Sequence, residues 1–148
     1  MKITSFFQIT VLCFFFFSNV DAKDSKSFDL GKTLFDKNET EKSKIFFERD
    51  IVFNPKNYKS YLYLAKIYKK ADDDVDEEMN LKSVLLLNPD HDEALYLLIL
   101  LKIKQSDYKA ANELIKKFDL VCDLFCHKKS EMKEKFDKLI PENENKQN

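Results

Sequence analysis

Two cysteines and a histidine near the C-terminus are, by type and spacing, the residues best suited to specific chemistry. Cys122 and Cys126 are separated by three residues, and His127 follows directly. If the chain is exported, an isolated cysteine pair most often forms a disulfide. Residues four apart in an unbroken helix hold their Cβ atoms about 6 Å apart, whereas a disulfide needs roughly 3.5–4.5 Å. We therefore predict a Cys122–Cys126 disulfide, with two free thiols as the alternative, and a helix that ends near Val121.

The same segment supports a second hypothesis, covalent attachment of haem in a redox or haem-binding protein. The usual attachment sequence is Cys-x-x-Cys-His, and this chain has one extra residue between its cysteines. His127 and Met132 would then be the axial ligands. The extra residue weighs against haem, and a zinc site on the two cysteines and His127 would lack a fourth ligand. We expect neither a metal nor a cofactor.

An acidic run invites a calcium hypothesis, because Asp72, Asp74 and Asp76 alternate as in a helix–loop–helix calcium site. That loop needs glycine at its sixth place and glutamate at its twelfth, where this chain has Glu77 and Ser83. A solvated turn before a helix is the better interpretation. The chain contains only two histidines and one glycine, and it has none of the common nucleophile or phosphate-loop motifs, so we expect no enzyme.

Composition favours a single all-α domain. The 148 residues include 25 Lys plus Arg and 26 Asp plus Glu, so no overall field favours nucleic acid or an anionic membrane. One glycine and three prolines leave few tight turns for a sheet protein. The abundance of Lys, Glu and Leu favours helices instead.

The elements that must position any site are helical repeats. The pair Asn54-Pro55 recurs 34 residues later as Asn88-Pro89, and a fixed period of this length is typical of stacked repeats. Between these pairs, an apolar stripe at helical spacing begins at Tyr61. The segment 94–101 is hydrophobic nearly all round, so its helix must be covered on several sides.

This pattern resembles the tetratricopeptide repeat (TPR) family. The resemblance implies a right-handed superhelical stack of about three helix–turn–helix units over residues 23–140, counted from Asp24, Tyr58 and Asp92. A C-terminal capping helix would carry Met132, Phe136, Leu139 and Ile140 on its apolar face. In the first unit Asn38 is expected in a left-handed conformation and Thr40 as a helix cap; Ser106 or Asp107 has the capping role in the third.

Two residues depart from the family pattern. Asp50 and Glu77 stand where the family has small residues on its second helix. We expect the contact between the two helices of a unit to be splayed at Glu77.

The resemblance also implies a binding surface for a protein or peptide on the concave side of the stack. Fixed positions on the first helix of each unit would line it, forming an apolar strip beside several lysines. Such a strip suits a partner segment with hydrophobic anchors and acidic flanks. Self-association through the same strip, as an assembly subunit, is the alternative. The predicted residues are Phe28, Lys32, Phe35, Lys59, Leu62, Lys66, Lys69, Tyr96, Leu100 and Ile103.

The sequence predicts that the two ends of the chain do not belong to the helical domain. Residues 1–22 have a positive start, an apolar run over 3–17 and the small residues Val20 and Ala22 before the expected cleavage point, which is typical of a signal peptide. An uncleaved N-terminal anchor is the alternative. The polar residues 141–148 are expected to be disordered. We predict an exported protein of the bacterial envelope, with the periplasm as its compartment.

Overall fold

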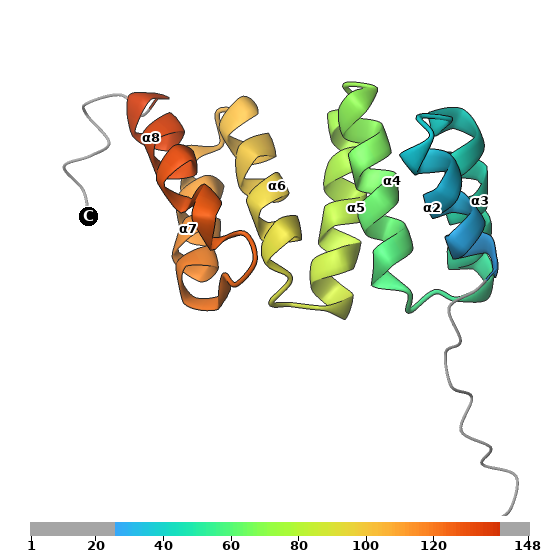
Figure 1. Ribbon diagram of the computed structural model, residues 1–148. Helices are drawn as coiled ribbons and strands as arrows, with labels where there is room; N and C mark the ends of the chain where they lie inside the picture. The colour runs from blue at the N-terminus through green and yellow to red at the C-terminus, as the bar shows by residue number, and fades with distance from the viewer. Residues whose placement is uncertain (1–25, 140–148) are drawn as a thin grey trace, which may run out of the picture.

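The computed structural model describes residues 26–139, and this part of the chain is all-helical, with no strand. Figure 1 shows the helices standing side by side in one elongated row. None of them is long and apolar enough to cross a membrane. The predicted signal peptide and C-terminal tail lie outside the described residues. The elements are α2 (Lys26–Asp36), α3 (Thr40–Phe53), α4 (Tyr58–Lys70), α5 (Asp74–Leu87), α6 (Asp92–Lys104), α7 (Tyr108–Val121), η2 (Cys126–Lys128) and α8 (Lys129–Leu139).

The 34-residue period runs from α3 to α7. Helices α3, α5 and α7 begin at residues 40, 74 and 108, and α4 and α6 at residues 58 and 92. The residue two before each of α3, α5 and α7 has a positive φ near 60°, at Asn38, Asp72 and Ser106. Asparagine, aspartate and serine tolerate this left-handed conformation better than bulky residues do. The backbone therefore makes the same turn in all three units, the first included.

The helix caps differ slightly from the expectation. The residue before α3 is Glu39, which makes no side-chain capping bond, and Thr40 is already the first helical residue. The prediction of Thr40 as a cap was therefore wrong by one position. In the third unit Ser106 occupies the left-handed position, so Asp107 is the cap and accepts a hydrogen bond from the Ala110 N–H at 3.1 Å.

The helices pair as three antiparallel hairpins, α2 with α3, α4 with α5 and α6 with α7, and α8 lies beyond the last pair (Figure 1). A large apolar core is built around α6, in which residues 94–99 are all buried, as the sequence predicts. A smaller core of Phe28, Phe47, Leu64 and Ile67 joins the first two units. The expected all-α stack of helical repeats is confirmed.

Gly31 allows α2 to approach α3 closely. A Cβ atom at this position would lie 2.8 Å from the ring of Phe47, whose side chain is fully buried. The equivalent positions of the next units hold Ala65 and Ile99, so only the first unit requires glycine. Its tight packing holds the first hairpin against the aromatic residues described below.

The two acidic departures from the repeat pattern are accommodated differently. Asp50 is fully buried and accepts hydrogen bonds from Asn57 Nδ2 at 2.7 Å, from Asn54 Nδ2 at 3.1 Å and from the Ser60 hydroxyl. It thus ties the first unit to the second. Glu77 is also buried, and this burial raises the pKa of its carboxyl. Helices α4 and α5 stay in close contact beside Glu77, so the splaying expected there is absent.

Candidate protein-binding surface

Three lysines of α4 stand above aromatic rings on one side of the helix. Lys59, Lys66 and Lys70 are spaced by seven and four residues, which places them within about 40° of one another around the helix axis. The Lys59 ammonium lies 5.8 Å from the ring centroid of Phe28. The Lys66 and Lys70 ammonium groups lie 5.1 Å from Tyr63 and 4.5 Å from the centroid of a third ring, Phe35. These are cation–π distances.

The rings beneath the lysines form one cluster between α2, α3 and α4. Tyr63 stacks on Phe47 with centroids 4.9 Å apart. Its ring also meets the edges of Phe28 at 5.8 Å and Phe35 at 5.1 Å. Phe28 and Phe47 are buried, whereas Phe35 and Tyr63 are half-buried and reach the surface. We call this surface the lysine–aromatic face; it consists of Phe28, Phe35, Lys59, Tyr63, Lys66 and Lys70.

Positive charge is in excess around this face. Lys66 Nζ pairs with Glu93 of α6 at 2.7 Å. The nearby Lys32 pairs with Asp36 at 2.6 Å, and this hydrogen bond raises the pKa of Lys32. Within residues 26–139, neither Lys69 nor Lys70 forms an ion pair. The lysines therefore outnumber the carboxylates that neutralise them, and the face is suited to a negatively charged ligand.

The structure brings together about half of the residues predicted from the sequence. Phe28, Phe35, Lys59 and Lys66 belong to the lysine–aromatic face, and Lys32 lies close enough to Tyr63 to influence the pKa of its hydroxyl. Burial is the larger influence there, and it raises the Tyr63 pKa.

The remaining predicted residues lie elsewhere. Leu62, Tyr96 and Ile103 are buried in the large core, and Leu100 is half-buried against it. Lys69 is exposed. The expected apolar strip is therefore not an exposed surface along its length, because its central side chains fill the interior of the stack. Whether any of these residues contacts a partner stays a prediction.

Two residues of the face were missed by sequence reasoning. Tyr63 and Lys70 lie outside the family positions used to choose candidates. Their spacing from Lys59, at four and eleven residues, puts both on the same side of α4, and that signal was present in the sequence.

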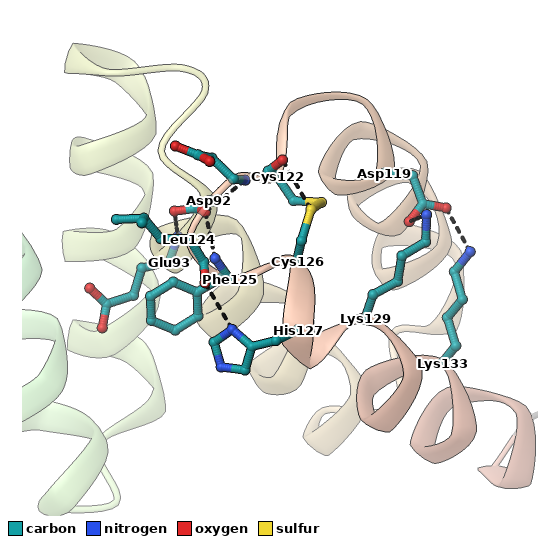
Figure 2. Close-up of a disulfide and its surroundings, with 11 residues drawn as sticks. Asp92, Glu93, Asp119, Cys122, Leu124, Phe125, Cys126, His127, Lys129 and Lys133 are labelled. Atoms are coloured by element: carbon teal, nitrogen blue, oxygen red, sulfur yellow. Dashed lines mark hydrogen bonds and ion pairs between the residues drawn. A yellow bond between two sulfur atoms is a disulfide. The ribbon is translucent and has the colours of Figure 1, made fainter.

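The C-terminal end of the stack is closed by a turn held in two ways (Figure 2). Helix α7 ends at Val121 as predicted, and the Sγ atoms of Cys122 and Cys126 are bonded at 1.94 Å. In addition, Asp92 Oδ2 accepts hydrogen bonds from the backbone N–H groups of Asp123 at 3.0 Å and Phe125 at 2.8 Å. Burial opposes the charge of Asp92, but these N–H donors hold its pKa below the ordinary value. The turn is therefore pinned to the start of α6.

This turn explains why Tyr96 is covered. The Phe125 ring lies against Tyr96 with centroids 5.7 Å apart. Beyond it, Lys129 and Lys133 of α8 pair with Asp119 of α7 at 2.9 and 2.6 Å, which fastens the last helix to the stack (Figure 2). The chain's own C-terminal segment thus covers Tyr96 in the third unit, whereas Phe35 of α2 and Tyr63 of α4 reach the surface.

The cysteine segment does not fit the haem hypothesis. Each Sγ is bonded to the other, so neither can form a thioether while the disulfide stands. His127 is exposed, with Nδ1 2.8 Å from the Leu124 carbonyl oxygen. Met132 is fully buried in the large core. Met132, considered as an axial ligand, is thus held inside the core, whereas His127 lies at the surface.

The acidic turn before α5, which was considered as a calcium site, forms ion pairs with a lysine of α6. Lys104 Nζ pairs with Asp74 at 2.6 Å and also with Asp72. This pairing lowers the pKa of Asp72 and links the turn of the second unit to the end of α6. Within residues 26–139, no group of three or more His, Cys, Asp or Glu side chains is arranged to hold a metal ion.

Comparison with known proteins supports the fold. No family model matches the sequence, and no curated protein sequence matches it. Among solved structures, the chain is similar to the TPR domain of Sgt2 from Aspergillus fumigatus, with a TM-score of 0.64 and 18% sequence identity. The match covers 76% of this chain and 78% of that one. The described fold is therefore TPR-like, as the resemblance in the sequence implied.

Proposed function

We propose that this chain is a protein-interaction module that holds a short acidic segment of a partner protein on the lysine–aromatic face. The observation that carries the proposal is the row of three lysine ammonium groups above an aromatic cluster, of which Phe35 and Tyr63 reach the surface. The TPR-like fold supports the same class of function, since stacked repeats present extended surfaces for binding.

A lysine of this face can exchange its contact with an aromatic ring for an ion pair with the partner protein, because the two contacts are similar in free energy. A cation–π contact at an exposed site contributes roughly 0.5–1 kcal/mol, and an exposed ion pair about as much. A carboxylate of the partner can therefore draw the exposed Lys70 away from its ring at little cost. The uncovered edges of Phe35 and Tyr63 can then accept an apolar side chain of the same partner segment.

The spacing along α4 sets the length of the segment. From Lys59 to Lys70 the helix rises by about 17 Å. An extended peptide covers this distance in about five residues, since it rises roughly 3.3 Å per residue. The preferred ligand is therefore a stretch of about five residues with carboxylates at its ends and one apolar side chain between them.

A peptide-display selection tests the proposal before any partner is identified. Random 12-residue peptides selected on the wild type should be enriched in Asp and Glu around an apolar residue. The charge-reversed variant Lys59→Glu/Lys70→Glu should bind the selected peptides at least roughly tenfold more weakly. Lys109→Glu/Lys116→Glu, which reverses two exposed lysines on α7, is the matched control and should keep wild-type binding. Selection of neutral or basic peptides, or equal loss in both variants, would refute the proposal.

Export to an oxidising compartment is part of the proposal. The Cys122–Cys126 disulfide supports it, because such bonds persist in secreted and periplasmic proteins and are rare in the cytosol. Mass spectrometry of the protein recovered from the periplasm of a bacterial host should give a chain that begins at Lys23 and is two hydrogens lighter than its reduced form. Recovery of the whole chain from the cytosol with free thiols would contradict this part.

A further inference from the structure

Helices α3 and α5 are apolar on two sides, and the second side faces solvent. Their inner sides carry the buried residues Phe47, Leu81 and Val84. Their outer sides carry further large apolar side chains, with Val52 73% and Leu86 82% exposed. We call this surface the outer apolar patch; it consists of Ile45, Val52, Phe53, Val75, Met79 and Leu86.

Helix α7 has charged residues at repeat positions where α5 has exposed apolar ones. Lys109 and Glu113 stand there in place of Val75 and Met79, 34 residues earlier. Of these outer positions, α7 keeps only Leu120 as an exposed apolar residue, at 86%. A helix of a stable monomer normally presents charged residues to water. An apolar patch confined to two neighbouring units is typical of an interaction site.

The outer apolar patch has equivalent apolar residues on α3 and α5, so two copies of it can match each other. Both helices pack against α4 and lie behind α2 and α4 in the view of Figure 1. Val52 of α3 and Leu86 of α5 occupy the same repeat position, as do Ile45 and Met79. Between each pair stands a charge, and the two charges are opposite: glutamate at 48 and lysine at 82.

We propose that the outer apolar patch is a dimer interface between two copies of this chain, with α3 of each copy against α5 of the other. A two-fold axis parallel to the helices brings Val52 onto Leu86 of the other copy. The same operation brings Glu48 opposite Lys82 of the other copy, and symmetry forms each contact twice. Two-fold association through one self-complementary patch is the commonest form of protein oligomer.

The charges around the patch favour a second copy over a lipid surface. The centre of the patch carries one charge of each sign, Glu48 and Lys82, and a second copy related by a two-fold axis matches both, whereas an anionic bilayer matches only the lysine. The present partner of Glu48 is Lys44, at 3.8 Å, and Lys82 pairs with Glu78 at 2.7 Å. Both pairs lie within one helix, and Glu78 keeps a second partner in Lys102 at 2.7 Å, so Lys82 can turn to the other copy without leaving Glu78 unpaired.

Sedimentation velocity over a concentration series tests the interface, on protein obtained by expressing all 148 residues. The wild type should sediment as a dimer at about 100 μM, a concentration at which a micromolar complex is saturated. Leu86→Glu should weaken dimerisation by at least roughly tenfold. Leu120→Glu is the matched control, since the residue has the same repeat position and similar exposure, and it should leave the dimer intact. Both residues face water, so circular dichroism should show unchanged folding.

A charge-swap series tests the register. Glu48→Lys and Lys82→Glu should each weaken the dimer, and the two substitutions together should restore it. A wild type that stays monomeric at about 100 μM overturns the proposal, as does equal loss in Leu86→Glu and Leu120→Glu. Flotation of a monomeric wild type with phosphatidylcholine vesicles, lost in Leu86→Glu, would assign the patch to lipid and also overturns it. Peptide binding at the lysine–aromatic face should be unaffected by Leu86→Glu, which keeps the two proposals separable.

Discussion

The turn that closes the last unit is expected to survive loss of its disulfide. The Cys122→Ser/Cys126→Ser variant should lose about 2 kcal/mol of unfolding free energy, because the bond closes a loop of only a few residues. For a domain of this size, each kcal/mol shifts Tm by about 3–6 °C, so Tm should fall by roughly 6–12 °C. Urea unfolding of the variant and of the oxidised wild type measures this loss.

Asp92 should keep the turn in place in that variant. Its carboxylate accepts two backbone hydrogen bonds, at 2.8 and 3.0 Å, and a bond to a charged group contributes about 1.5–3 kcal/mol. Hydrogen exchange should therefore find the Asp123 and Phe125 amides still protected when the disulfide is absent. In Asp92→Ala both amides should exchange rapidly, whereas Asp90→Ala, which changes an exposed neighbour, should leave them protected.

Two results would refute this account of the turn. Rapid exchange of both amides in the serine variant, with Asp92 intact, would mean that the disulfide alone holds the turn. Unchanged stability of the serine variant would mean that the bond does not constrain the unfolded chain.

Three further predictions concern packing and ionisation. Gly31→Ala should destabilise by about 1 kcal/mol in urea unfolding, since its Cβ would lie 2.8 Å from the Phe47 ring and overpacking outweighs the gain in helix propensity; equal stability would contradict this. Glu77→Gln should raise Tm at pH 7, because burial raises the pKa of Glu77 and so disfavours its ionised form, and the difference should vanish below about pH 4, where both side chains are neutral. Lys102, with a second lysine, lowers the pKa of Glu78 from 4.5 to about 2. The contribution of the Glu78 carboxylate to the unfolding free energy should thus be complete above pH 4.5 and be lost as the pH falls towards 2. Urea unfolding midpoints measured across this pH range check this, and an equal decline in the wild type and in Glu78→Gln would contradict it.

Much of the fold could be predicted from the sequence because its signals are local. The two Asn-Pro pairs give the period, and the residues between them give the helical stripe. The end of α7 at Val121 follows from the geometry of a disulfide between residues four apart. Each of these inferences uses only the order of residues along the chain and fixed helix geometry.

The candidate site was harder to predict, because it depends on how separate helices meet. Tyr96 was expected at an exposed position, but it is covered by Phe125, which is placed by hydrogen bonds to Asp92 more than thirty residues away. Lysines were expected beside an apolar strip, whereas Lys66 and Lys70 lie above rings brought together by the close approach of α2, α3 and α4. No local pattern reports such contacts.

The measurement that tests the central claim most directly is an NMR titration of the protein with a peptide from the display selection. If the lysine–aromatic face is the binding site, amide shifts should be confined to α2 and α4 and should include Phe35, Tyr63 and Lys70. The same titration of Lys59→Glu/Lys70→Glu should show almost no shifts. Shifts centred on α7, or on the outer sides of α3 and α5, would contradict the claim.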